Sequence, residues 1–434
     1  MKTERAGNRR SEQGSVLMVT LYIAILFGMF LGAYFYLARQ QNNLVARSQG
    51  WNAAISMAEA GVEEALAQMN PGASLLVTWG LSHPEVDFNA NGWGPPSGGF
   101  YGPMNRTMAI GSSTNSYSVV FTTDTLPIIY CTGYVTIPAL SATLSRTVRV
   151  TTTNAALFSA GLVGIHGIDF KGNNITTDST NLANPSLTQG TNGDIASISG
   201  FANVGNSTVN GTVYLGPTAT NTIKSNGIIT GGVSNDFNVE FESVVLPAGT
   251  AGWVAPTAGS TTISNVTYQY AFGPGTPNPI LTNYVIDGVS ATMNGTSIYV
   301  GTNTHVRLLV TDQHATPVDI RVAGVGTNAG QLTLYMNAPT FKISGHQNID
   351  GGDAASFSYY GTTNNTAVDL SGSAQFIGTI YAPQANVFLN GGSGIWGAVV
   401  GNWVTMTGSA FFHFDESLVA SGPWRYIANS WQEL

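Results

Sequence analysis

Charged residues and cysteine are scarce in this sequence of 434 residues. Only 9% of the residues are charged, and Cys131 is the only cysteine, so no disulfide can form within one chain. The first fourteen residues carry four bases and two acids, a net +2, which leaves eleven bases against twenty-one acids, or −10, in the other 420. A nucleic-acid-binding surface needs clustered basic residues, so this class of function is not expected.

The sequence also lacks the short motifs of common catalytic sites, since it has no Gly-x-Ser-x-Gly elbow, His-Glu-x-x-His pair or phosphate-binding loop. His413 and Asp415 would share one face of a strand beside Glu416, an arrangement that a metal or an acid–base pair can use. A terminal polar cap over a core containing Phe412 and Phe414 is the favoured interpretation. Two further acidic segments, 312–314 and 350–353, match no calcium-loop spacing and are predicted to be solvated turns. We therefore predict no catalytic residue, no cofactor and no metal ligand.

What the sequence has in quantity is glycine, 52 residues, together with many threonines, serines and asparagines. Such a composition is typical of short strands that alternate with tight turns. The hydrophobic content of 43% is sufficient for a buried core. We expect a mainly β protein.

The exception is an apolar run near the N-terminus. Residues 15–38 include no charged side chain, and as a helix these 24 residues would reach about 36 Å, enough to cross a bilayer. The run is longer than the core of a cleaved signal sequence, and the bases at Lys2, Arg5, Arg9 and Arg10 favour a cytoplasmic N-terminus. The rest of the chain is then extracytoplasmic.

The predicted helix continues beyond the membrane. Apolar residues recur at intervals of three and four on one helix face, at Trp51, Ile55, Ala58, Val62, Ala65 and Met69. Asn70, Pro71 and Gly72 then end the helix, because proline cannot continue it. One helix of about 50 residues up to Met69 is expected.

This N-terminal region resembles type IV pilin-like proteins, in particular the PilX-type minor pilins. The similarity rests on the basic leader that ends at Gly14, the apolar helix, and the stretch "AISMAEAGVEEALAQM" at 54–69. The resemblance implies that a prepilin peptidase cuts after Gly14 and leaves Ser15 as the mature N-terminus. It also implies that the helix packs with other pilin subunits through Val19, Trp51, Ile55, Ala58 and Val62.

The sequence departs from the family at one position. Type IV pilins usually carry a glutamate at the fifth mature position, where it can pair with a neighbouring terminal amine, and here that residue is Val19. A buried unpaired amine is costly, so a position at the tip of a filament, with no subunit stacked above, is expected.

Short repeats of strand and turn fill the C-terminal half. An apolar, any, apolar, polar, glycine unit occurs in "VDLSG" (368–372), "VFLNG" (387–391) and "VTMTG" (404–408), and Gly200, Gly216 and Gly232 are sixteen residues apart. Coils of this length predict a parallel β-helix or β-solenoid. The stretch 378–418 resembles the C-terminal β-helical region of PilX-type proteins.

The predicted organisation has five parts. A leader (1–14) precedes the transmembrane and pilin-like helix (15–72), a pilin-like β region (73–154), a β-solenoid head (155–418) with an insertion around 233–335, and a C-terminal tail (419–434). Trp396 and Trp403 are candidates for contact with a surface or carbohydrate ligand, although packed aromatic residues fit the same pattern.

These features predict a non-catalytic minor pilin-like subunit of a type IV pilus or related filament. The resemblance implies the inner membrane, prepilin peptidase and other pilins as its partners and a place on a cell-surface filament, where the head serves adhesion or assembly priming. Two alternatives stay open: a membrane-anchored surface β-helix that does not polymerise, and a β-helical carbohydrate-active enzyme.

Overall fold

The fold consists of two units, which are described separately below. The computed structural model describes all residues except 1–9, 71–92, 111–112, 138–141, 159, 183–189, 238, 248, 280–281, 344–347, 351–352, 373–374, 393 and 422–423. One unit, the helix–sheet unit, comprises Met1–Ala65, Asn89–Thr152 and Ala428–Leu434, and the other, the head, comprises Leu66–Phe88 and Thr153–Ile427. The head is thus inserted in the sequence of the helix–sheet unit.

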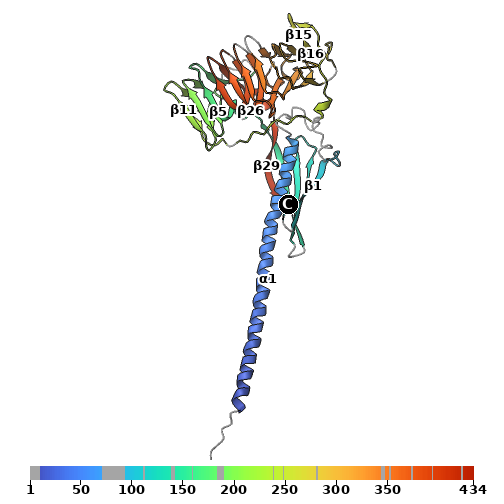
Figure 1. Cartoon of the computed structure of the whole chain (residues 1–434), viewed down its shortest axis with the longest axis vertical. Helices are drawn as coiled ribbons and strands as arrows, with labels where there is room; N and C mark the ends of the chain where they lie inside the picture. Colours follow the sequence, from blue (N-terminus) through green and yellow to red (C-terminus); the bar gives the residue numbers. More distant parts are fainter. Residues whose placement is uncertain are drawn as a thin grey trace, which may run out of the picture. The chain divides into compact units, whose positions relative to one another are not determined.

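The long N-terminal helix α1 runs from Arg10 to Met69. The expected end at Met69 is confirmed, and Asn70 N–H still donates to Leu66 O at 2.9 Å. The helix begins five residues before the predicted mature N-terminus, Ser15. It is one uninterrupted element, as the periodicity indicates (Figure 1).

A five-stranded sheet accompanies the helix in the helix–sheet unit. Its strand order is β1-β2-β3-β4-β29, and β1 to β4 are joined as an antiparallel meander. The strands are β1 (Phe100–Ile110), β2 (Ser113–Thr122), β3 (Ile128–Ile137), β4 (Ala142–Ala156) and β29 (Trp424–Glu433). The sequence predicted only a tail at 419–434, whereas the structure has the short helix α2 (Ser417–Ser421) and the edge strand β29 there.

Glycines allow the helix to lie very close to this sheet. A Cβ atom added to Gly133 of β3 would be 2.1 Å from Ala54 O and 2.7 Å from Ala58 N, both in the backbone of α1. One added to Gly61 of α1 would be 2.4 Å from Cys131 Sγ. Since real Cβ atoms do not approach other atoms so closely, side chains at these two positions would force the layers apart.

A polar cluster fixes the same contact nearer the end of the helix. Arg106 donates from Nε and Nη2 to Glu64 Oε1 at 3.1 and 3.0 Å, and Tyr117 donates its hydroxyl to Glu64 Oε2. Cys131 is fully buried beside them, and burial raises the pKa of its thiol to about 12. The thiol therefore packs as a small apolar group.

The head is built on a 22-stranded sheet of parallel pairs, which agrees with the predicted β-solenoid class. Its first arm contains β5 (Leu162–Phe170), β6 (Thr176–Thr180), β7 (Ile195–Ser197), β8 (Phe201–Gly205), β9 (Thr208–Val209), β10 (Val213–Leu215), β11 (Thr220–Ile223), β12 (Ile228–Ile229) and β13 (Val233–Ser234). Each coil pairs in parallel with the preceding one, as in β5–β7–β10–β13.

The second arm starts far from the end of the first and returns towards its beginning. It contains β16 (Tyr270–Phe272), β17 (Asn283–Ile286), β18 (Ser297–Val300), β19 (His305–Val310), β20 (Asp319–Val322), β21 (Gln331–Met336), β22 (Thr340–Ile343), β23 (Asn348–Asp350), β24 (Phe357–Gly361), β25 (Ala367–Leu370), β26 (Gln375–Leu389), β27 (Gly394–Met406) and β28 (Phe411–Asp415). Parallel pairs connect β17, β19, β21, β24, β26 and β27 in this order.

The two arms meet at the seam, which we define as the parallel pairs β27–β5 and β28–β6. Val399 pairs with Leu162 and Phe412 with Thr177 there. In Figure 1 the labels β11, β5, β26 and β16 therefore follow one another along one stack. Buried residues of both arms form one hydrophobic cluster, so the head has a single continuous core.

The predicted insertion at 233–335 differs from this arrangement. Residues 236–256 and the hairpin β14–β15 (Thr261–Ile263 and Val266–Tyr268) leave the coils, whereas β16 to β21 belong to the stack. The chain crosses from one end of the stack to the other and contacts coils along the way. Val244 forms a β-bridge with Thr362, and Val254 forms one with Tyr284. The irregular spacing in this region marks the return of the chain from the β13 end of the stack to the β16 end, and the coils of both arms advance in the same direction.

We predict that Gly133→Ala destabilises the helix–sheet unit by about 1–3 kcal/mol, because the new methyl group meets helix backbone that cannot give way. Thermal unfolding and amide exchange in β3, measured on the full chain in detergent, would report the loss. Gly392→Ala is the control, since no atom lies within 4 Å of its added Cβ. Equal stability of the two variants would contradict the close packing.

Candidate functional site

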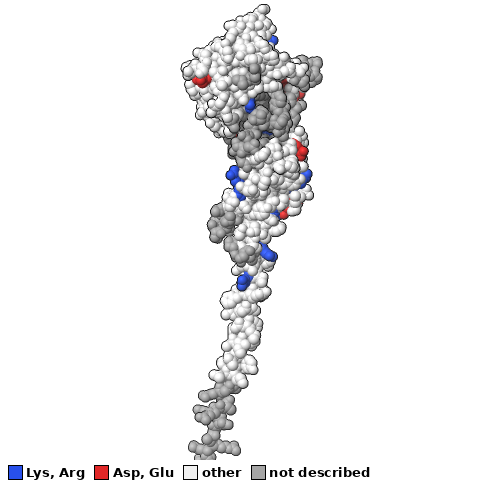
Figure 2. All heavy atoms as spheres, turned by 90° about the vertical axis from the view of Figure 1, so that its right-hand side faces the viewer, with Lys and Arg blue, Asp and Glu red and all other residues white. Residues whose placement is uncertain are grey.

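The most exposed apolar surface among the described residues is the N-terminal half of α1. All side chains from Val16 to Leu37 are exposed, including Phe27 at 71% and Phe30 at 72%. This is the one described helix that is long and apolar enough to cross a membrane, by length and composition. Figure 2 shows almost no charged atoms along this stretch. Such a surface requires lipid or other apolar partners.

The proposed processing bond, Gly14–Ser15, lies within the first turns of α1, which begins at Arg10. The side chains there, and the leader residues 1–9, are outside the described residues. Cleavage after Gly14 therefore stays a prediction from the resemblance.

The five residues predicted to pack against other filament helices fall into two groups. Val19 and Trp51 are exposed, at 56% and 48%, and Ile55 is half-buried. Ala58 and Val62 are 0% and 2% exposed, because their face of α1 lies on the sheet of the same chain. Within one chain this face is already occupied, so the prediction of intersubunit packing does not suit Ala58 and Val62. Helical periodicity reveals a buried face but not the partner that covers it.

Trp51 connects α1 to the C-terminal strand. The guanidinium of Arg146 in β4 lies over its indole ring at 5.2 Å, within the range of a cation–π interaction. Arg146 also forms a bidentate pair with Glu433 of β29. The pairing with Arg146 lowers the pKa of Glu433. These three side chains join the helix, β4 and β29, and no sequence spacing indicated this.

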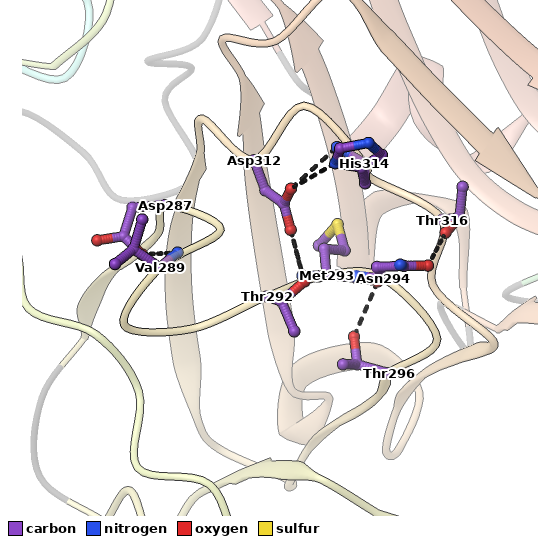
Figure 3. Close-up of polar contacts among 9 residues, drawn as sticks. All are labelled: Asp287, Val289, Thr292, Met293, Asn294, Thr296, Asp312, His314 and Thr316. Atoms are coloured by element: carbon purple, nitrogen blue, oxygen red, sulfur yellow. Dashed lines mark hydrogen bonds and ion pairs between the residues drawn. The ribbon is translucent and has the colours of Figure 1, made fainter.

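Two carboxylates in the segment 287–314 organise a loop of the head (Figure 3). Asp287 Oδ1 accepts N–H groups from Val289 at 2.9 Å, Ser290 at 2.7 Å and Ala291 at 3.3 Å. These three bonds lower the pKa of Asp287 to about 2. The carboxylate closes the turn that carries Val289, in the manner of an Asx turn.

Asp312 fixes the other side of this loop from a buried position. Its Oδ2 accepts the Thr292 hydroxyl at 2.7 Å and Met293 N–H at 2.9 Å, and its Oδ1 accepts His314 N–H at 2.9 Å. Burial favours a higher pKa for Asp312, but these hydrogen bonds outweigh it and lower the pKa. The 312–314 segment was predicted as a solvated turn, and Asp312 at 3% exposure differs from that description. His314 remains exposed at its side chain.

The second acidic segment predicted as a solvated turn also has a structural carboxylate. Asp353 is 8% exposed, accepts Gly326 N–H at 2.9 Å, and accepts the Ser356 hydroxyl at 2.5 Å. Asp350 belongs to β23, and its side chain is outside the described part. Groups of three or more His, Cys, Asp or Glu residues that could hold a metal ion do not occur among the described residues.

The closing residues 411–416 lie at the seam. Phe412 and Phe414 are buried, as predicted, at 0% and 6%. His413 Nδ1 contacts Asp178 Oδ1 of β6, and its ring stacks on Trp396 with centroids 5.1 Å apart. Asp178 comes from the other arm of the head, 235 residues away along the chain, so no local motif could reveal this pair.

Asp415 and Glu416 attach loops to the end of β28. Asp415 Oδ1 accepts N–H groups of Leu182 and Ser417, both at 3.1 Å, and burial raises the pKa of this carboxyl group. Glu416 Oε1 accepts the hydroxyl of Ser179 at 2.6 Å and an N–H of Asn192 at 2.8 Å. Both carboxylates therefore connect the first arm to the end of the second.

The two tryptophans proposed for ligand contact, Trp396 and Trp403, both lie in β27. Trp403 makes an edge contact with Phe201 at 5.3 Å, and it covers Gly167, whose added Cβ would be 2.4 Å from Trp403 Cζ3. Trp396 stacks on His413. Both rings are half-buried and have packing partners, so neither forms a free aromatic platform.

A shallow groove of about 510 Å³ lies beside the hairpin β14–β15. Its lining is neutral and mostly small: Ala258, Gly259, Ser260, Thr267, Gln269, Gly295 and Ser297. Hydroxyl and amide groups of this kind form hydrogen bonds with neutral polar ligands.

Comparisons with known proteins give a match to a family model and a distant similarity to a solved structure. Residues 283–420 match a family model described as a domain of unknown function, DUF7305. A search of curated proteins gave no match. Among solved structures, the chain is similar to the competence-associated pilin ComZ from Thermus thermophilus, with 11% identity and a TM-score of 0.27 over 88% of this chain and 97% of that one. A score at this level carries no argument about function.

We predict that Asp287 stabilises its loop above about pH 4 and loses this effect as the pH falls towards 2. The folded pKa is lowered to about 2, below the ordinary value of about 3.9, so the stabilisation is complete above the unfolded pKa and disappears through the folded one. Amide exchange at 289–291, corrected for intrinsic rates, should show this fall in protection.

Asp287→Asn should abolish the pH dependence and lower protection at pH 7, because the neutral amide accepts these bonds less strongly. Asp236→Asn is the matched control, since Asp236 bonds only to the Ser234 hydroxyl among the described groups. A pH profile unchanged in Asp287→Asn would show that another group controls the loop.

Proposed function

We propose that this chain is a minor pilin-like subunit of a type IV pilus or related filament, anchored by α1 and displaying the head outside the cytoplasmic membrane. The observation that carries the proposal is the division of α1 into two halves. Its N-terminal half has no partner within the described chain and is apolar all around, whereas its C-terminal half packs on a small antiparallel sheet. This division suits a helix that first resides in lipid and then packs beside other helices.

The head suits a display function. Its main segment, Thr153–Ile427, is one continuous stretch of chain that starts in β4 and ends in β29. Its carboxylates at 287, 312, 353 and 415 accept hydrogen bonds from loop backbone or hydroxyl groups. The neutral groove near β14–β15 offers a surface for adhesion to hydroxylated molecules.

A place at the filament tip is supported by Val19, which supplies no charge for the amine of a neighbouring subunit. Two other functions remain as rivals. An anchored surface protein would keep the same fold without processing after Gly14. A carbohydrate-active enzyme would show turnover, and no specific arrangement of the described carboxylates favours it.

Cleavage after Gly14 is the most direct test of this proposal. In native cells the protein should begin at Ser15, and this processing should disappear without the prepilin peptidase or in a Gly14→Leu variant. Gly28→Leu, in the exposed apolar half of α1, should leave processing intact. N-terminal sequencing and intact mass would distinguish the forms. An intact leader in peptidase-positive cells would contradict the pilin proposal and favour an anchored surface protein that is not processed.

A second prediction concerns the tip. Val19→Glu restores a carboxylate that can pair with a neighbouring amine, so more copies should enter the filament shaft. Quantitative mass spectrometry of sheared filaments should then show a several-fold rise in copies per unit of major subunit. Val19→Gln is the neutral control. If Val19→Glu and Val19→Gln enter filaments equally, the missing charge does not restrict this subunit to the tip.

A further inference from the structure

The two ends of the stack of coils in the head differ in how their backbone edges are satisfied. At the end formed by β16 and β17, Val285 N–H donates to Val254 O at 2.9 Å, and Asn278 Nδ2 donates to Ala271 O at 3.0 Å. The Asn278 side chain also exchanges hydrogen bonds with Thr257. Val254 and Thr257, which directly precede the hairpin β14–β15, and the side chain of Asn278 therefore cap this end, as terminal repeats of solenoids usually require.

The opposite end, formed by β11, β12 and β13, has no such cap among the described residues. Each of these strands pairs with the coil beneath it, β8, β9 and β10 respectively, and in the part of the chain that the structure describes none of the three has a partner strand on its outer side. The backbone bonds of the intervening turns also run inward, as in Lys224 N–H to Gly205 O at 2.9 Å. Three open edges thus face the same way, at the end marked by β11 in Figure 1.

Apolar side chains of this last coil are exposed in consequence. Ile223, Ile228 and Val233 are 42%, 53% and 42% exposed, whereas Val209 and Val213 in the preceding coil are 0% exposed. An open strand edge with exposed apolar residues is an aggregation hazard unless a partner covers it. A partner that covers this end would therefore present three strand edges arranged like those of β11, β12 and β13.

We propose that this open end, residues 220–234, pairs with the same end of a second copy of the chain. A second copy presents the same outline and the same three edges, and a twofold contact brings its strands into antiparallel register. Head-to-tail stacking is blocked, because the other end is capped by Val254, Thr257 and Asn278. The contact is closed at two copies and produces no fibre.

The charges at this end are self-complementary. Lys224 and Asp236 are both exposed and carry opposite signs, and in the sequence Lys224 precedes Ile228 and Val233 whereas Asp236 follows them, just beyond the last strand. A twofold contact can place the lysine of one copy near the aspartate of the other. Charge pairing of this kind selects the orientation more than it adds affinity.

The contact is small, because residues 220–234 provide fewer than the roughly 20 to 30 residues a side of a standard interface. Pairing is expected where heads are concentrated, as on a membrane, and to be weak in dilute solution. The inference concerns the head surface alone and holds whether or not the chain enters a filament.

Cysteine cross-linking of the full chain in membrane vesicles tests this pairing directly. Native Cys131 is buried, so it should not react. New cysteines in the open end, in Asn226→Cys or Thr230→Cys, or directly after it, in Asn235→Cys, should give a disulfide-linked dimer under mild oxidation. Val266→Cys is the matched control, exposed on the hairpin near the capped end. At least one open-end variant should cross-link several-fold more than the control.

Adding Ile228→Lys to the reactive variant should reduce the cross-link several-fold, because it puts charge into the contact. Its side chain is 53% exposed, so the unfolding temperature of the variant should stay close to that of the parent. Cross-linking equal to that of Val266→Cys would show random collision or helix-driven association, and would overturn the proposal. An undiminished cross-link in a folded Ile228→Lys variant would overturn it as well.

Discussion

The head depends on one non-local interaction, the parallel pairing at the seam. Val399 meets Leu162 across 237 residues of chain, and β28 meets β6 beside it. Neither arm is complete without this contact, since β5 and β27 each use one edge for their own arm and the other for the seam. Pairing of such distant segments requires loop closure before it gains stability, so the head is expected to fold slowly and as one unit. The side chains of Asp178, His413 and Glu416 add polar contacts at the same place.

The helix–sheet unit depends on a different constraint, the presence of glycine at two positions where α1 meets β3. Gly133 and Gly61 let the backbone of one layer touch the other, and the Glu64 cluster then fixes their position. This close contact occupies one face of the helix within the chain, whereas Val19 and Trp51 stay exposed. One helix therefore serves two environments, because its apolar residues form a stripe after position 50 and a full circumference before position 38.

Local patterns in the sequence were enough to predict the helix to Met69, the small sheet and the parallel coils. They failed where the answer depended on distant partners. A 3.6-residue period identified the buried face of Ala58 and Val62 but could not show that the chain covers this face itself. Strand β29 was missed because residues 427–434 are all exposed and thus lack alternation. The return of the chain along the stack, which brings Asp178 and His413 together, produces no recognisable local pattern in the sequence.

The scarcity of charge explains how this chain uses the carboxylates it has. Asp194, Asp287, Asp312, Asp353 and Asp415 each accept at least one backbone N–H of a turn or loop. Asp287 and Asp312 are each held by three donors, which favour the charged form and lower the pKa, so these two carboxylates are poorly suited to take up a proton. In a solenoid, loops at the corners of the coils determine the outer surface, so these acids shape what the head presents. Neutral hydroxyl and amide groups on such a surface can bind a partner by shape and hydrogen bonding, as the proposed display role requires.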